Sequence, residues 1–185
     1  DPRRHGLEAF KPEPLAEYRY KAPKLHWLLE VLSLIQHRAE KAIIFCEFRA
    51  IQRLLKYYIE QVFNFSPDII NGDTQASARA ADSRQKRLKA FQAKPGFGAI
   101  ILSPVAVGVG VNIQAANHVI HYTRHWNPAK EDQATDRAYR IGATKDVHVY
   151  YPVIHADDFT TFDMKLHELL NRKRELARDM LNGTG

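Results

Sequence analysis

Cysteine is nearly absent from this sequence, whose 185 residues include one cysteine, Cys46. A lone thiol cannot form a disulfide within the chain, and no cysteine or histidine spacing typical of a zinc site occurs. Cys46 lies inside an apolar run, which predicts a small buried core residue. The sequence therefore argues against a disulfide-stabilised fold or a zinc domain, and we expect no metal site built by this chain.

Long apolar segments and a signal-peptide pattern are also missing. No run approaches the roughly 18 apolar residues that a transmembrane helix needs. We therefore expect no membrane association. The expected location is the cytoplasm of a bacterium or, if the source is eukaryotic, the nucleus.

A third absence concerns nucleotide chemistry. The sequence contains no Gly-x-x-x-x-Gly-Lys-Ser/Thr loop and no strand ending in Asp-Glu that would suit magnesium. Phosphoryl transfer requires phosphate cradling, a metal and a group that orients water. This chain alone is therefore not expected to hydrolyse a nucleoside triphosphate.

The charge balance is mildly basic. Lysine and arginine number 27 against 21 acidic residues, a formal net charge of +6. Such an excess favours a polyanionic partner, although many soluble domains carry a similar one. A hydrophobic content of 45% in 185 residues is sufficient for one domain with its own core.

Apolar periodicity predicts helices alternating with short strands. We expect helices over 25–35, 51–62, 77–91, from 128 onward and over 158–181, and strands over 43–45, 68–70, 99–103, 118–121 and 147–153. This alternation predicts an α/β fold of three layers, with a mainly parallel sheet, helices on both faces and a C-terminal helix. The predicted organisation is a lead-in over 1–22, one lobe over 23–157 and a helical extension over 158–185.

A helical stripe near residue 137 predicts an anion site. On a helix, Gln133, Arg137 and Arg140 share one face, because seven residues return almost to the same side. Neighbouring arginines repel each other weakly in water, and their planar guanidiniums suit a phosphate. The alternative is a solvated face on which Asp136 pairs with Arg140 for about 0.3 kcal/mol.

Two further segments lie before this helix. Gly108 and Gly110 follow a predicted strand, where glycine allows a sharp turn and close approach of a ligand. Trp126-Asn127-Pro128 stands immediately before the arginine helix, and Pro128 suits its first turn. We interpret Trp126 as a packing anchor.

Together these segments resemble the second, C-terminal RecA-like lobe of superfamily-two helicase motors, in the Swi/Snf group of DNA translocases. The resemblance covers roughly residues 22 to 152. Motif IV resembles 41–48, motif IVa resembles 71–74 with Arg84 and Phe91, motif V resembles 102–112, and motif VI resembles 133–142 after the Trp-Asn-Pro box. In motif V, Pro104, Val105 and Val107 replace the residues usual in the family, which removes one basic side chain and one flexible position.

The resemblance implies specific roles. It implies that Arg140 is an arginine finger on the γ-phosphate of ATP, that Arg137 is its companion and that Gln133 is a polar contact across the cleft. Residues implied to connect the nucleotide cleft with the DNA track are Gly108, Gly110 and Asn112. Residues implied to contact the DNA backbone are Gly72, Thr74, Ser103 and Arg84.

The same resemblance implies the partners and the cofactor. ATP with Mg²⁺ would be held mainly by an N-terminal RecA-like lobe of the same polypeptide, and double-stranded DNA would lie across both lobes. We expect a monomer. The chain would thus be part of a larger ATP-dependent enzyme that moves along DNA.

Three alternatives stay open at this point. The lobe could belong to an RNA helicase, against which the Trp-Asn-Pro box and Asp136 argue. It could be a degenerate motor lobe that serves as a binding or scaffold module. It could also be a dinucleotide-binding domain, although no Gly-x-Gly-x-x-Gly follows a first strand.

Overall fold

The computed structural model describes residues 22–71, 78–105, 113–138 and 144–183, with the backbone alone described for 78–82 and 137–138. The helices are α2 (Pro23–His37), α3 (Arg49–Phe63), α4 (Ala78–Ala93), α5 (Pro128–Ala138) and α6 (Phe162–Asn182). The strands are β1 (Lys41–Phe45), β2 (Ile69–Ile70), β3 (Gly98–Leu102), β4 (His118–His121) and β5 (His148–Tyr150).

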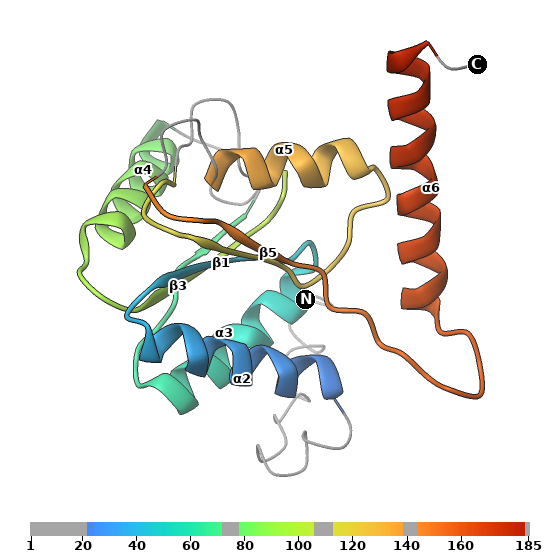
Figure 1. Ribbon diagram of the computed structural model, residues 1–185. Coiled ribbons are helices and arrows are strands. Elements are labelled where there is room, and N and C mark those ends of the chain that lie inside the picture. Colours follow the sequence, from blue (N-terminus) through green and yellow to red (C-terminus); the bar gives the residue numbers. More distant parts are fainter. Residues whose placement is uncertain (1–21, 72–77, 106–112, 139–143, 184–185) are drawn as a thin grey trace, which may run out of the picture.

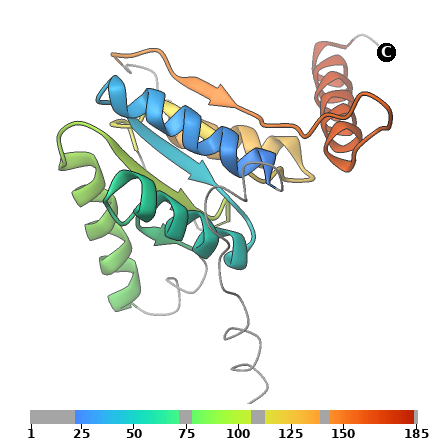
Figure 2. The same ribbon diagram turned by 90° about the horizontal axis from the view of Figure 1, so that it is seen from below.

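The strands form one five-stranded sheet in the order β2-β3-β1-β4-β5, and every neighbouring pair is parallel. Parallel neighbours need long crossover connections, which helices supply here. Helices α2 and α3 cover one face and α4 and α5 the other, whereas α6 stands beside the sheet (Figures 1 and 2). The predicted three-layer α/β fold with a mainly parallel sheet is confirmed.

Burial on both faces explains why the central strands are apolar throughout. In β1, Ala42 and Ile44 pack with α2 and α3, whereas Ile43 and Phe45 pack with α4 and α5. All residues of β1, β3 and β4 are buried. A strand with helices on both faces needs apolar side chains at consecutive positions. Cys46 belongs to this core, and burial raises the pKa of its thiol to about 11.

The end of the sheet differs from the sequence prediction. Strand β5 ends at Tyr150 rather than at 153, and α6 begins at Phe162 rather than at 158. The backbone of Ile154 bonds to the beginning of α6 instead of to the sheet: its N–H donates to Asp163 Oδ2 (3.1 Å) and its carbonyl accepts from Thr161 Oγ1 (2.5 Å). Thr161 also caps α6 by accepting a bond from the Met164 N–H at 3.1 Å. No helix in the described ranges combines the length and the apolarity that crossing a bilayer requires.

A buried histidine joins the sheet to α5. His121 is 1% exposed at the end of β4, and its Nε2 lies 2.8 Å from Thr135 Oγ1 on α5. Its ring stacks between Phe45, at a centroid distance of 5.2 Å, and Tyr151, at 4.9 Å. Burial lowers the pKa of His121 to about 4. The imidazole is therefore neutral at physiological pH.

We predict that this histidine destabilises the fold in mild acid. An unfolded histidine has a pKa of about 6.5, so between that pH and pH 4 the unfolded state binds more protons. The unfolding free energy should then fall as the pH decreases, by about 2 kcal/mol from pH 7 to pH 5 for this one group. Urea unfolding of the 185-residue chain at both pH values should show a smaller loss in His121→Phe than in the parent. His155→Phe, at a side chain 63% exposed, is the control. An equal loss in His121→Phe would mean that this histidine is not held neutral.

Replacing a leucine by alanine should have different effects on stability in the two halves of α6. Leu170 is fully buried, whereas Leu176, within the same helix, is 63% exposed. Leu170→Ala should cost about 2–5 kcal/mol of unfolding free energy, because a buried leucine loses both its transfer energy and its packing. Leu176→Ala should stay within about 0.5 kcal/mol, as expected at an exposed position. Urea unfolding followed by circular dichroism measures both, and equal losses would contradict the docking of α6 through its first half.

Candidate functional site

The carboxyl ends of the parallel strands meet at one edge of the sheet, which is where open α/β folds bind their ligands. Phe45, Leu102 and His121 are in register as the last residues of β1, β3 and β4. Ser103 follows β3 directly; it is buried, and its N–H donates to the carbonyl of Ile70 in β2 at 2.9 Å. The structure therefore places Ser103 on this edge, as a motif V residue at the end of its strand.

A buried amide connects the ends of β1 and β2 at the same edge. The Gln52 side chain is fully buried, and its Nε2 donates to the carbonyl of Cys46 at 2.6 Å. Its Oε1 accepts from Asn71 Nδ2 at 3.0 Å. Sequence reasoning missed Gln52, because its position on α3 sits among the apolar residues of a helical stripe and nothing in the spacing identifies its partners.

The Trp-Asn-Pro box forms the beginning of α5. Asn127 Oδ1 accepts from the N–H of Ala129 at 3.0 Å, and Pro128 occupies the first helical position, where its missing N–H costs nothing. This placement of Pro128 confirms the prediction. Asn127 and Pro128 thus fix where α5, the helix that carries the first half of motif VI, begins.

The first half of motif VI lies on α5 as predicted. Ala134 is buried against the sheet, whereas Gln133 beside it is exposed. The backbone of Arg137 lies in the last turn of α5, four residues after Gln133, which is about one helical turn. The helix therefore presents Gln133 away from the core.

Other predicted site residues lie outside the described residues. They are Gly72, Thr74, Gly108, Gly110, Asn112 and Arg140. Arg84 lies on α4 and is partly buried, and the basic residues Lys86, Arg87 and Lys89 that follow it are exposed. The structure thus brings Gln133 and Arg137 onto one helix and places Ser103 on the sheet edge; it leaves the remaining assignments as predictions.

A buried carboxylate that sequence reasoning did not single out fixes α5 to its surroundings. Glu131 is 1% exposed and forms a two-pronged ion pair with Arg124, with Nε to Oε1 at 2.8 Å and Nη2 to Oε2 at 3.1 Å. Burial alone would raise the pKa of Glu131, but the hydrogen bonds and charge of Arg124 hold it below its usual value. Breaking a buried pair on one side costs about 3–5 kcal/mol, because the other charge is left uncompensated.

Arg174 extends this network to α6. Its Nη2 lies 3.1 Å from Glu131 Oε2 and 2.8 Å from Asp132 Oδ1. Hydrogen bonds to Asp132 and Glu131 raise the pKa of Arg174 despite the opposing effect of burial. Sequence reasoning did not anticipate these contacts, because the partners of Arg174 are 42 and 43 residues earlier in the chain, a separation that helical spacing cannot reveal.

Trp126 departs from its predicted role as a packing anchor. Its side chain is 54% exposed, and its ring meets Phe162 edge-on at 5.9 Å. The carbonyl of Trp126 accepts from Lys173 Nζ at 2.9 Å. The residue therefore contacts α6 at the surface and does not belong to the core.

The opposite edge of the sheet carries a second histidine cluster. His118 is 1% exposed; its Nε2 contacts the Glu40 carboxylate, and its Nδ1 lies 3.0 Å from the Tyr150 hydroxyl. Burial lowers the pKa of His118, although Glu40 opposes that shift. This cluster is at the amino ends of β1 and β4, away from the candidate site. Within the described part of the chain, no group of three histidine, cysteine or acidic residues is placed to hold a metal ion.

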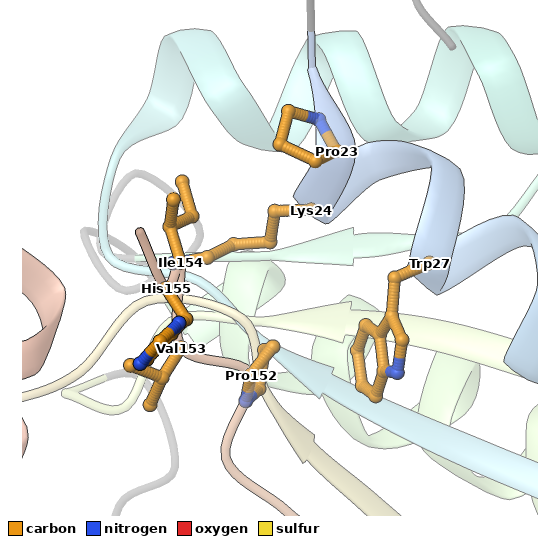
Figure 3. A pocket seen from close by; sticks show the side chains of 7 residues that line it. All are labelled: Pro23, Lys24, Trp27, Pro152, Val153, Ile154 and His155. Carbon is orange, nitrogen blue, oxygen red and sulfur yellow. The ribbon is translucent and has the colours of Figure 1, made fainter. Parts of the chain in front are cut away.

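A pocket of about 240 Å³ lies between the start of α2 and the segment after β5 (Figure 3). Its lining is mainly apolar and comprises Pro23, Lys24, Trp27, Pro152, Val153, Ile154 and His155. The charge of Lys24 is already engaged by Asp163, at 2.9 Å. The other titratable residue in this lining, His155, lies 3.5 Å from Asp157, so both titratable groups of the lining already face acidic partners.

Comparison with known proteins identifies the family of the chain and its fold. The family described as "Helicase conserved C-terminal domain" matches residues 23–142. The chain is 59% identical over 174 residues to the Zorya protein ZorD of Escherichia coli O139:H28, covering 94% of this chain and 16% of that protein. It therefore spans about a sixth of the length of this relative.

Two solved structures share the fold of this chain. The C-terminal part of the Fun30 ATPase domain superimposes with a TM-score of 0.73 at 26% identity, covering 90% of this chain and 50% of that one. The Sulfolobus solfataricus SWI2/SNF2 ATPase core in complex with dsDNA gives a TM-score of 0.61 at 32% identity, covering 86% of this chain and 31% of that one. The dinucleotide-binding alternative is thereby excluded.

The parallel sheet, the first half of motif VI on α5 and these likenesses lead to one assignment: the chain belongs to the family of helicase conserved C-terminal domains and has the RecA-like fold seen in the C-terminal part of Swi/Snf-like ATPases.

Proposed function

We propose that this chain is the second motor lobe of an ATP-dependent DNA translocase, and that its motif VI supplies an arginine finger to ATP held by the first lobe. The observation that carries the proposal is the placement of α5. The helix begins at the carboxyl edge of the sheet, its Glu131 is fixed in a buried ion pair, and Gln133 faces outward two residues later. A rigid helix of this kind can present guanidiniums to a ligand on the neighbouring lobe.

The proposed chemistry divides between the lobes. Phosphoryl transfer is accelerated mainly by positioning and by neutralising negative charge that develops on the phosphates. In this proposal Arg140 meets the γ-phosphate, Arg137 assists on the same phosphates and Gln133 makes a polar contact across the cleft. Mg²⁺ would neutralise charge on the β- and γ-phosphates and would be held mainly by the first lobe. The isolated chain would then not hydrolyse ATP.

The second part of the proposal is a DNA backbone track. Ser103 on the sheet edge, with Gly72, Thr74 and Arg84, would contact phosphates, and Gly108, Gly110 and Asn112 would link the track to the nucleotide cleft. Backbone contacts of this kind carry no sequence preference. Support comes from the net charge of +6 and from the likeness to an ATPase core solved with double-stranded DNA, which also favours DNA over RNA. The partners proposed are thus the first lobe and duplex DNA.

We predict that Arg140→Ala in the full-length parent reduces DNA-stimulated ATP turnover by roughly 10³ to 10⁵, the range for arginine fingers. The finger acts mainly on charge that develops in the transition state, so binding of an ATP analogue should weaken far less. Arg140→Lys should restore little, because an ammonium cannot reproduce the planar fork.

The control for this experiment is Arg172→Ala, at an exposed arginine of α6 that pairs with Glu168. It should leave turnover unchanged, and thermal melts should show that all variants are folded. If folded Arg140→Ala turns over ATP at the parental rate, Arg140 is not the finger, and a surface pair with Asp136 becomes the better account.

We also predict weak binding of the 185-residue chain to duplex DNA, without sequence preference. Each phosphate neutralised should contribute about −0.9 to the slope of log affinity against log salt concentration. Arg84→Ala should make the slope shallower by about 0.9, whereas Arg172→Ala should leave it unchanged. Fluorescence anisotropy with labelled DNA over a salt series measures the slope. An unaltered slope in folded Arg84→Ala would remove this residue from the track.

A further inference from the structure

The buried carboxylate of Glu131 accepts four hydrogen bonds from donors in two segments, the β4–α5 connection and α6. Oε1 accepts from Arg124 Nε at 2.8 Å and from the His125 N–H at 2.9 Å. Oε2 accepts from Arg124 Nη2 at 3.1 Å and from Arg174 Nη2 at 3.1 Å. A carboxylate has about four lone-pair sites, so these bonds leave it little freedom to reorient. The turn of α5 that carries Glu131 is therefore held from the β4–α5 connection on one side and from α6 on the other.

Arg124 is itself fixed by more than its pair with Glu131. Its Nη1 lies 2.9 Å from His167 Nδ1 on α6, so each of its three nitrogens has a partner. The guanidinium lies over the Tyr151 ring at 4.5 Å, and the guanidinium of Arg174 lies 5.6 Å from the same ring. Tyr151 in turn stacks on His121 at 4.9 Å. The network thus connects β4, α5, the segment after β5, and α6.

We propose that Glu131 is a positioning residue for ATP hydrolysis, whose contacts with Arg124 and Arg174 set the placement of α5 and of the motif VI arginines that this helix leads to. The inference rests on the proposed function of Arg140. Glu131 touches no substrate in this account; it acts through the helix.

Glu131 lies close enough to Arg137 along α5 for a movement of one residue to displace the other. Glu131 and Arg137 belong to the same described helix, six residues apart, or about 9 Å along its axis. A helix transmits a shift or rotation of its first turns to its last turn without much loss. Misplacing a catalytic group by about 1 Å can reduce a rate about 10²-fold. Loosening the Glu131 contacts should therefore lower the rate of the chemical step more than the affinity for ATP.

The test uses the full-length parent with DNA present. Glu131→Gln should lower kcat by about 10- to 100-fold, while KM for ATP changes by less than about threefold. The matched control is Asp132→Asn, which removes the other carboxylate partner of Arg174 at the adjacent, 53% exposed position and should leave kcat within about twofold. A purely structural role predicts a lower melting temperature with parental kcat measured well below it, and that result would overturn the inference.

A second variant covers the case in which Glu131→Gln does not fold. Arg124→Lys keeps a positive charge beside Glu131 but loses the two-pronged geometry. Like Glu131→Gln, this variant should lower kcat and leave KM for ATP nearly unchanged. A folded Arg124→Lys with parental kcat would contradict the inference whatever happens to Glu131→Gln.

A double-mutant cycle separates this inference from the proposed function. If Glu131 acts through the arginine finger, Glu131→Gln should cause little further loss in an Arg140→Ala background, measured by single-turnover hydrolysis. An undiminished further loss would show that Glu131 acts elsewhere and would overturn the inference alone. Parental turnover in Arg140→Ala would overturn the proposed function, and the inference with it.

Discussion

The ion pair between Glu131 and Arg124 is the contact on which the arrangement of this lobe's outer elements depends. Both side chains are nearly inaccessible, at 1% and 5% exposure, so the pair is stable only because each charge is fully bonded. An apolar pair could supply similar stability. It could not impose the directional bonds that fix α5 relative to the β4–α5 connection and, through Arg174 and His167, relative to α6.

This polar network lies on a core that is otherwise apolar and continuous. Helices on both faces bury every residue of β1, β3 and β4, and the carboxyl ends of those strands deliver motif residues to one edge. Asn127 and Pro128 fix where α5 begins, and the ion pairs of Glu131 hold its first turns. In the proposed mechanism, the orientation of α5 decides whether an arginine reaches a phosphate on the other lobe.

Periodicity predicted most of the described fold because two-sided burial leaves a strong pattern. The range 118–121 matches β4 and Pro128 is the first residue of α5. The predictions were wrong where contacts between distant parts of the chain determine the structure. Ile154 bonds to the beginning of α6 and not to the sheet, and Trp126 contacts Phe162 at the surface. Glu131 and Arg174 were not predicted because their pairing joins positions 43 residues apart, whereas Gln133 and Arg137 lie on one helix, as their spacing predicted.

The most direct test is a structure of the full-length parent bound to duplex DNA and a non-hydrolysable ATP analogue. The decisive measurement is the distance from the Arg140 guanidinium to the γ-phosphate. The account predicts hydrogen-bonding distance, about 2.7–2.9 Å for a charged pair, with the contact between Glu131 and Arg124 intact. An Arg140 that points into solvent or pairs with Asp136 while ATP is fully enclosed would contradict it.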